Sequence, residues 1–358
     1  MDHSDRGLPP RLHVEPPLFN SANPWATTLE HLRDLYKCPY TGAVTTRTAL
    51  VGQGFPHDES VHRFEFFEAR THRVVTGKGG EHDGLGTGDA SLNTLGYSPI
   101  PLDGYLDFIR KIDEEEEEED DVKAGAKGAN KRKPFIVSVT GSPDEVAECY
   151  RRIVRCAEAL RMVLAMEVNL SCPNIPGKPP PAYEGEALRA YLRCIQEAVQ
   201  EMGEPYAPWG LKTPPYTHAS QFEMFVKALR GCAGLWPGGN MAVAPVSFVT
   251  ATNTLGSCLL LDEGEGTLSP ALGIGGLAGA PLHPLALGNV ATLRRMLDAA
   301  PETKHVVVLG IGGVADAAAY RRMRSVGAAA VGIGTALGIK GLGVFKEIEN
   351  GLGGVWEV

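Results

Sequence analysis

The chain lacks the features that mark a membrane-spanning, secreted or zinc-binding protein. No apolar run approaches the ~20 residues that a membrane-spanning helix needs. The first 20 residues hold Asp2, Asp5, Glu15 and four prolines, which fits neither a secretory signal nor an Arg-rich transit peptide. Seven scattered cysteines include no C-x-x-C pair, so the sequence indicates neither a zinc site nor a disulfide framework. We therefore expect a soluble protein of the reducing cytoplasm.

The chain also lacks a basic face for nucleic acid. Its formal net charge is -9, and the nine adjacent carboxylates of residues 113–121 account for all of it. The remainder is electrically balanced and has the composition of a globular protein. Adjacent like charges repel one another, and this run continues into a stretch of Lys, Arg, Gly and Ala. The sequence therefore predicts a disordered, solvated insertion over residues 113–133.

From Lys133 onward, apolar strand patterns alternate with amphipathic helix patterns. Near-continuous apolar strands in repeated βα units are typical of a parallel sheet that is buried on both faces. An early helix at 29–35 and a strand at 44–46 bring the number of units close to eight. This favours a closed (β/α)8 TIM barrel, with residues 1–358 as a single domain, over an open sheet. The later predicted strands are 134–140, 163–170, 209–212, 246–250, 306–309 and 328–333, and the later predicted helices are 143–160, 184–202, 219–230, 285–300, 315–326 and 341–351.

Two amides, a hydroxyl and a thiol gather where the predicted strand 163–170 ends. They belong to Asn169, Ser171, Cys172 and Asn174. Amides offer both donors and an acceptor to a planar ligand, and a thiol can act as a nucleophile or move a proton. Ligands bind at the carboxyl ends of strands in barrels and in open α/β sheets. The alternative is an ordinary loop with an inert structural cysteine, and the residue types alone do not separate the two.

Glycine clusters end the last two predicted strands. Gly312 and Gly313 follow one strand, and Gly334 and Thr335 follow the next. Glycine lets backbone N–H groups approach an anion, and the loops after strands 7 and 8 of such barrels commonly bind phosphate. Residues 310–315 also fit a dinucleotide fingerprint, but the next strand lacks the acidic residue that would bind a ribose. Each cluster alone is typical of a tight turn, whereas the pair favours a phosphate site.

Other polar residues also stand at predicted strand ends. Lys212 ends an apolar strand, where a lysine is costly unless it meets an anion, and Asn253 and Thr254 follow the next strand. Asn93 is ambiguous by itself. The glycine-rich stretch around Lys78 follows no strand and precedes no apolar helix, so it fails the context test for a phosphate loop.

Taken together, these motifs resemble the dihydroorotate dehydrogenase family. The likeness runs from about Phe19 to Leu352, with the acidic segment excepted. The run Asn169–Asn174, continued by Ile-Pro-Gly-Lys-Pro, is similar to the class 1A branch. The class 1B branch generally lacks that continuation, and the membrane-associated class uses a serine base and carries an N-terminal hydrophobic extension. Further matches are Gly-Leu-Lys-Thr-Pro-Pro-Tyr at 210–216, Asn-Thr-Leu-Gly at 253–256, Gly-Gly-Leu-Ala-Gly at 275–279 and Gly-Ile-Gly-Thr-Ala-Leu at 332–337.

The resemblance implies an FMN at the barrel mouth. Lys212 would lie at the flavin N1/O2 edge, where negative charge develops on reduction. Cys172 would be the active-site base, and the backbone of Leu95 and Gly96 would receive the substrate carboxylate. The residues expected at the FMN phosphate are Gly312, Gly313, Gly334 and Thr335, with Gly276 nearby. The residues expected to hold the pyrimidine are Asn93, Asn169, Asn174, Asn253 and Thr254.

Three segments depart from the family pattern. Arg47 stands in the cofactor site where the family usually has lysine, and it keeps the charge but not the shape. Residues 20–23 read Asn-Ser-Ala-Asn instead of Asn-Ala-Ser-Gly, and 96–99 read Gly-Tyr-Ser-Pro instead of Gly-Leu-Pro-Asn. These changes border the expected flavin and substrate.

The resemblance implies an enzyme of de novo pyrimidine biosynthesis. It would oxidise (S)-dihydroorotate to orotate with fumarate as acceptor, and it would be a homodimer. Cys172 would take the C5 proton while a hydride passes from C6 to the flavin, and residues 173–183 would close over the site. The alternatives are an FMN-dependent oxidoreductase of another unsaturated or cyclic substrate and a non-catalytic flavin-binding paralogue. Cys172 and its surrounding amides argue against the last, because a pure binder needs no base.

Overall fold

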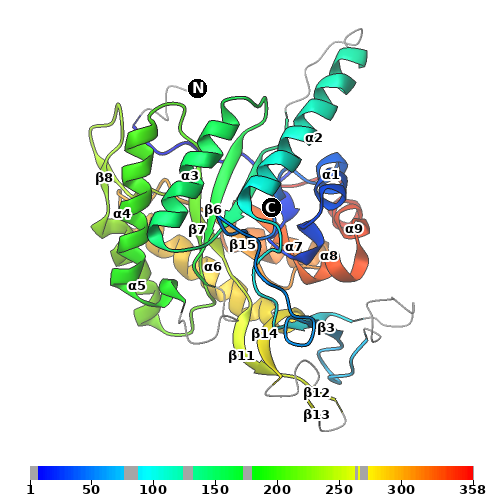
Figure 1. The fold of residues 1–358 in the computed structure, drawn as a ribbon. Coiled ribbons are helices and arrows are strands. Elements are labelled where there is room, and N and C mark those ends of the chain that lie inside the picture. Colours follow the sequence, from blue (N-terminus) through cyan, green and yellow to red (C-terminus); the bar gives the residue numbers. More distant parts are fainter. Residues whose placement is uncertain are drawn as a thin grey trace.

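A closed parallel barrel forms the centre of the molecule (Figure 1). The computed structural model describes residues 7–75, 88–123, 132–171, 180–262, 265–266 and 273–357. Within them the eight-stranded sheet has the order β1-β16-β15-β10-β7-β6-β5-β2, and a parallel bridge between Phe19 and Ala43 joins its two end strands. The predicted (β/α)8 fold is therefore confirmed. The strands are β1 (Leu18–Asn20), β2 (Val44–Thr45), β5 (Phe135–Val139), β6 (Leu164–Asn169), β7 (Trp209–Lys212), β10 (Phe248–Ala251), β15 (Val307–Ile311) and β16 (Ala330–Ile333).

Helices cover the outside of the barrel (Figure 1). The start of α3 shows how the sequence sets a boundary: the Ser142 hydroxyl accepts from the Glu145 N–H, and the Glu145 carboxylate accepts from the Ser142 N–H at 2.7 Å. No described helix is both long and apolar enough to span a bilayer. The helices are α1 (Leu29–Lys37), α2 (Leu102–Lys123), α3 (Pro143–Ala157), α4 (Gly185–Met202), α5 (Ala219–Gly231), α6 (His283–Asp298), α7 (Ala317–Ser325), α8 (Thr335–Lys340) and α9 (Gly343–Leu352), with short 3-10 turns η2 (Pro24–Ala26), η3 (Pro181–Tyr183) and η4 (Ala280–Leu282).

Side chains alternate between the helix layer and the barrel interior, as the two-residue period of a strand requires. On β6, Met166 and Val168 pack in the cluster shared with the helices, whereas Ala165 belongs to the interior cluster. Glu167 and Asn169 share the inward face with Ala165. The interior is thus apolar near the amino ends of the strands and polar toward their carboxyl ends, where a site is expected.

A second, antiparallel sheet lies at one end of the barrel and was not predicted from sequence (Figure 1). Its order is β11-β14-β4-β3. Its strands are short and glycine-containing, and they pair across distant parts of the chain, so local periodicity carries little signal for them. The strands are β3 (Phe64–Phe67), β4 (Ala90–Asn93), β11 (Leu255–Leu259) and β14 (Ile274–Gly279); two small hairpins pair β8 (Gly234–Leu235) with β9 (Ala242–Val243) and β12 (Leu261–Asp262) with β13 (Glu265–Gly266).

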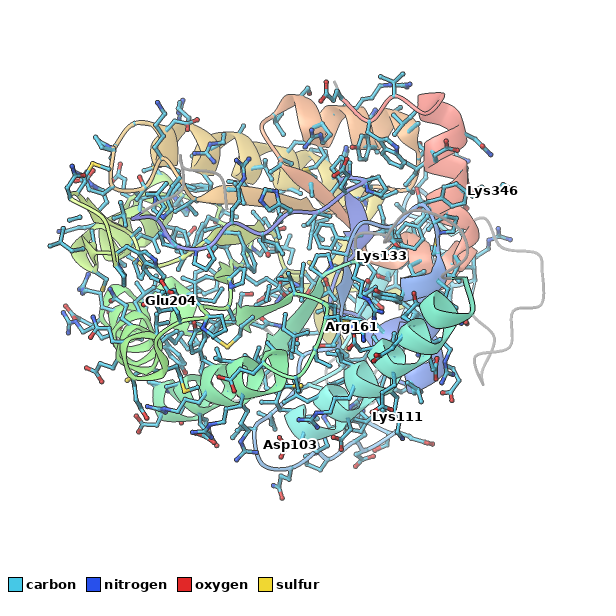
Figure 2. All side chains as sticks on the ribbon, turned by 90° about the horizontal axis from the view of Figure 1, so that it is seen from above. Asp103, Lys111, Lys133, Arg161, Glu204 and Lys346 are labelled. Atoms are coloured by element: carbon cyan, nitrogen blue, oxygen red, sulfur yellow. The ribbon has the colours of Figure 1, made fainter. Side chains whose placement is uncertain are left out.

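Part of the acidic segment is helical, contrary to the sequence-based expectation. Helix α2 continues to Lys123, and Figure 2 shows Arg161 and Lys133 beside it. Asp113 is buried and pairs with Arg132 at 2.9 Å, and Glu115 pairs with Arg33 at 2.7 Å. Cations from other elements offset the repulsion between the carboxylates. The prediction of disorder is therefore wrong for 113–123 and 132–133, and residues 124–131 lie outside the described part of the chain.

Candidate active site

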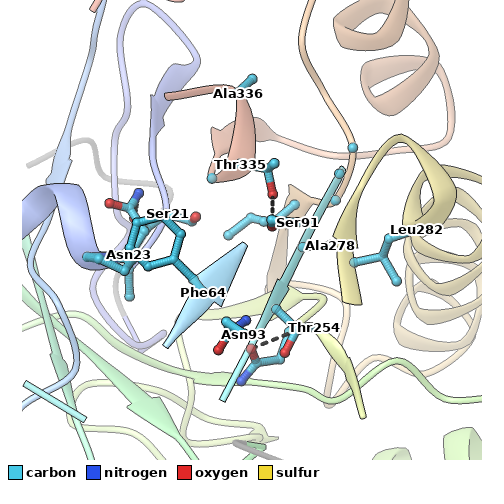
Figure 3. A pocket seen from close by; sticks show the side chains of 18 of the residues that line it. Ser21, Asn23, Phe64, Ser91, Asn93, Thr254, Ala278, Leu282, Thr335 and Ala336 are labelled. Atoms are coloured by element: carbon cyan, nitrogen blue, oxygen red, sulfur yellow. Dashed lines mark hydrogen bonds between the residues drawn. The ribbon is translucent and has the colours of Figure 1, made fainter. Parts of the chain in front are cut away.

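A cavity of about 600 Å³ opens where the barrel strands end and the second sheet begins. Figure 3 shows Asn93 and Ser91 of β4 on one side and Leu282, Ala278 and Thr335 around them. The barrel therefore supplies the floor of the cavity, and the unpredicted sheet supplies a wall.

Most of the predicted site residues line this one cavity, although they come from distant parts of the sequence. Gly276 does not line it, but its carbonyl accepts a hydrogen bond from Asn93 Nδ2 at 3.1 Å. Cys172 and Asn174 lie outside the described residues. The predicted residues that line the cavity are Arg47, Asn93, Leu95, Gly96, Asn169, Lys212, Asn253, Thr254, Gly312, Gly313, Gly334 and Thr335.

The amides at the end of β6 and β10 hold one another. Asn253 Nδ2 donates to Asn169 Oδ1 at 3.1 Å and to Ser171 Oγ at 3.0 Å. Asn169 Nδ2 in turn donates to Thr48 Oγ1 at 3.0 Å. Side chains fixed in this way present donors and acceptors to a planar ligand without reorganising when it binds. Ser171 also connects the cluster to the segment that begins with Cys172.

Lys212 is a buried cation with unused hydrogen-bonding capacity. Its Nζ lies 3.9 Å from Glu167 Oε1, and both side chains are at least nine-tenths buried. No described residue accepts a hydrogen bond from this ammonium, because 3.9 Å is too long for one. Its three N–H donors therefore have no acceptor among the described residues, and Lys212 lines the cavity. This arrangement suits a ligand atom that is negative or becomes negative there.

The glycines after β15 allow the backbone to come close to its neighbours. Gly313 has φ +67°, and a Cβ atom there would lie 2.6 Å from both the Gly279 carbonyl oxygen and the His283 Cβ. Gly312 has φ +136°, and a Cβ there would lie 2.5 Å from Ala286. Behind this loop the ring of His283 contacts the Gly312 carbonyl. Only glycine can adopt this backbone conformation without a clash, so backbone atoms, and no side chain, face the cavity here.

Arg47 reaches the cavity and contacts the loop that carries Gly96. Its Nη2 donates to the Gly96 carbonyl at 3.4 Å and lies 3.1 Å from His57 Nε2. The same ring nitrogen is 2.8 Å from the Tyr97 carbonyl. Burial lowers the pKa of His57 below its ordinary value, so the ring resists becoming a second cation beside Arg47. A planar cation thus stands at the edge of the cavity.

Several lining residues were not singled out from sequence. Trp25 and Phe64 form part of an aromatic cluster in which the Trp25 ring stacks on Phe66 with centroids 5.4 Å apart. Ser91, also not predicted, shares a hydrogen bond of 2.8 Å with Thr335, which was predicted (Figure 3). The alternation of Phe64 and Phe66 could have indicated a strand, but nothing local indicates which cavity it would face.

The described residues contain no group of three or more His, Cys, Asp or Glu that could hold a metal ion. The cavity is lined by amides, hydroxyls and backbone groups, and its charged lining residues are Arg47, Lys212, Lys340 and Asp89.

Comparison with known proteins agrees with this architecture. The sequence model of the family described as dihydroorotate dehydrogenase matches residues 84–355. The dihydroorotate dehydrogenase (fumarate) of Trypanosoma cruzi is 32% identical over 266 residues, which cover 73% of this chain and 72% of that protein. A probable dihydroorotate dehydrogenase A (fumarate) of Streptococcus pneumoniae is 27% identical over 338 residues, 94% of this chain and 88% of the relative.

A solved structure shows the same fold. The ligand-free DHODH of Eimeria tenella superposes with a TM-score of 0.64 at 17% identity, covering 94% of this chain and 83% of that one. On the family match and the level of identity to the trypanosomal relative, the chain belongs to the dihydroorotate dehydrogenase family of oxidoreductases.

Proposed function

We propose that this protein oxidises dihydroorotate to orotate and passes the electrons to fumarate, with FMN as its cofactor. The observation that carries the proposal is the joint presence, in one cavity, of the buried Lys212 ammonium and the interlocked amides of Asn169 and Asn253. Beyond the hydrogen bonds among described residues, Lys212 keeps its N–H donors, Asn169 keeps one amide N–H and Asn253 keeps one lone pair on Oδ1. The names of the fumarate-type relatives support the same substrates.

The residues present fit a flavin mononucleotide. A flavin supplies two-electron redox chemistry when bound. The close-packed Gly312 and Gly313, where a side chain would collide with neighbours, suit a phosphate bound by backbone N–H groups. Lys212 has donors for the N1/O2 edge of the ring, and Gly334 and Thr335 line the same cavity. FMN is favoured over a dinucleotide because no acidic residue stands at the end of β16 to bind a second ribose.

The substrate would lie against the amides. Asn93, Asn169, Asn253 and Thr254 offer donors and acceptors that match a pyrimidine ring, and Arg47 offers a charge for its carboxylate. Cys172 remains the proposed base and Asn174 a further pyrimidine contact, on the sequence resemblance alone. In the sequence Cys172 follows Ser171, whose hydroxyl accepts a hydrogen bond from Asn253.

A different cyclic or unsaturated substrate is the second candidate. It is favoured by Arg47, which stands where the family has lysine and is already engaged with Gly96 and His57. A guanidinium held in this way would select a ligand by shape as well as by charge.

The proposal is tested by steady-state turnover of the purified protein. With dihydroorotate and fumarate, orotate and succinate should form in equal amounts, and heat-released cofactor should co-migrate with FMN on chromatography. Release of FAD would contradict the cofactor assignment. Absence of orotate from a flavin-loaded protein would favour the second candidate. We further propose a cytoplasmic homodimer, to be tested by light scattering and by cell fractionation.

A further inference from the structure

Four polar side chains project into the barrel from three adjacent strands, and two of them, Asn169 and Lys212, line the cavity. The strand register pairs Ser138 of β5 with Glu167 of β6, and Asn169 of β6 with Lys212 of β7. Alternation places all of them on the inward face. Neither Ser138 nor Glu167 lines the cavity, yet both are buried. A buried carboxylate is costly unless partners hold it, so its contacts indicate what it does there.

The hydrogen bonds from Glu167 to the cavity run in one direction. Ser138 Oγ donates to Glu167 Oε1 at 3.1 Å, which uses the only proton of that hydroxyl. Thr48 Oγ1, 3.0 Å from Ser138 Oγ, must therefore be the donor in that contact. Because the Thr48 proton is used in turn, Thr48 accepts from Asn169 Nδ2 at 3.0 Å. A carboxylate can only accept hydrogen bonds, so Glu167 determines which atom is the donor in each hydrogen bond of this series.

This series of hydrogen bonds connects the proposed substrate side of the site, at Asn169, with the proposed cofactor side, next to Lys212. At one end, the amide of Asn169 is held with its nitrogen toward Thr48 and its oxygen toward Asn253, which orients it for a substrate. At the other end, Glu167 lies 3.9 Å from Lys212 Nζ, close enough to offset much of its charge at low dielectric.

We propose that Glu167 is a positioning residue that serves both halves of the active site. Through Ser138 and Thr48 it sets the orientation of the Asn169 amide, and through space it moderates the positive charge that Lys212 presents to the cofactor. The inference rests on the proposed roles of Asn169 and Lys212, but it concerns Glu167 and Ser138, neither of which lines the cavity.

The experiment separates the two effects with two variants of the flavin-loaded protein. Glu167→Gln removes the charge and retains an acceptor for Ser138, so the flavin midpoint potential should rise, because less negative charge then opposes reduction. Ser138→Ala keeps the Glu167 charge but breaks the series of hydrogen bonds between Glu167 and Asn169. The flavin midpoint potential should therefore stay at the parent value, while the Kd for orotate rises about tenfold, the scale of one hydrogen bond.

Thr250→Val is the matched control. Thr250 also faces the barrel interior, it pairs with Lys212 in the strand register, and its hydroxyl has no hydrogen-bond partner among the described residues. This substitution should leave both the potential and the orotate Kd at parent values.

Either of two results would overturn the inference: a parent-like potential in Glu167→Gln, or a parent-like orotate Kd in Ser138→Ala. A merely structural role would lower the melting temperature without changing the midpoint potential or the orotate Kd.

If Glu167→Gln releases the flavin, the Glu167→Asp variant is measured in its place. The Glu167→Asp variant keeps the charge on a shorter side chain, so weaker orotate binding would support the inference. A midpoint potential and an orotate Kd that both equal the parent values would contradict it. Failure of the parent protein to bind orotate would instead contradict the proposed function, and the potentials would still test the charge effect.

Discussion

The ring of His283 joins the glycine loop after β15 to helix α7. Its Nδ1 donates to the Gly312 carbonyl at 2.7 Å, and its Nε2 accepts from Arg322 Nε at 3.1 Å. The guanidinium can only donate, so the ring must be neutral with its proton on Nδ1. Burial lowers the pKa of His283 below its usual 6.5, Arg322 lowers it further, and the Gly312 hydrogen bond and Asp316 oppose the shift. The loop proposed to bind phosphate is therefore supported by a histidine that must stay neutral.

This relationship predicts a pH-dependent stability. The native protein binds the His283 proton less readily than the unfolded chain, so the stability from neutral His283 is complete above about pH 6.5 and declines as the pH falls toward the lowered native pKa. His283→Asn keeps a donor for Gly312 but cannot ionise. Melting temperatures measured from about pH 8 to 5 should therefore fall less steeply in this variant than in the parent.

Burial also lowers the pKa of His57 and His305, so the parent has other acid-sensitive groups. The difference between parent and variant isolates His283. Parallel curves would show that His283 does not carry the effect.

Loss of the Cys172 thiol should slow reduction of the flavin. If Cys172 is the base, Cys172→Ala should retain flavin yet reduce it ~10²-fold more slowly with dihydroorotate, the usual scale for loss of a general base. In the parent the rate should rise with pH toward the thiol reference pKa of ~8.5. Stopped-flow absorbance measures both. A variant that is as fast as the parent would make Cys172 a structural residue.

Substitutions of Arg47 separate the two candidate substrates. Arg47→Ala should weaken dihydroorotate binding or flavin reduction, and Arg47→Lys should retain much of the activity because it keeps the charge. Steady-state KM and kcat give the result. Unchanged kinetics in both variants would place Arg47 outside the substrate site. If the Arg47→Lys variant turns over dihydroorotate and the parent does not, the natural substrate is another compound.

The start of the acidic segment should contribute to stability. Asp113→Asn removes the carboxylate that pairs with the largely buried Arg132 at 2.9 Å, and removing one partner of such a pair costs about 3 kcal/mol of unfolding free energy. Glu117→Gln removes a half-exposed partner of Arg161 and should cost less than about 1 kcal/mol. Urea unfolding measures both values. Equal, near-zero costs would mean that residue 113 is solvated, as a disordered insertion requires.

Most of the barrel was predictable because the βα units from β5 onward carry their own periodic patterns, whereas the three-residue β1 was not among the predicted strands. The polar residues at strand ends, such as Lys212 and Asn253, were predictable because the carboxyl ends of parallel strands meet at one mouth. The wall formed by Phe64 and Ser91 was not predictable, because both strands are short. The strand of Phe64 pairs with β4, and β4, which carries Ser91, pairs on its other side with β14, almost 200 residues away in the sequence.

The acidic helix shows a different limit of sequence reasoning. A run of like charges predicts disorder only if no cation reaches it, and Arg33, Arg132 and Arg161 are supplied by distant parts of the chain. Glu167 was missed for the same reason. A glutamate within an apolar strand is visible in the sequence, but its partners Ser138 and Lys212 are known only from the strand register.

The most direct test is the anaerobic half-reaction of the flavin-loaded protein. Dihydroorotate added without oxygen should abolish the visible absorbance of the oxidised flavin, with one orotate formed per flavin, and fumarate added next should restore the absorbance. If the flavin stays oxidised in dihydroorotate but is bleached by a chemical reductant, dihydroorotate is not the substrate and the central claim is wrong.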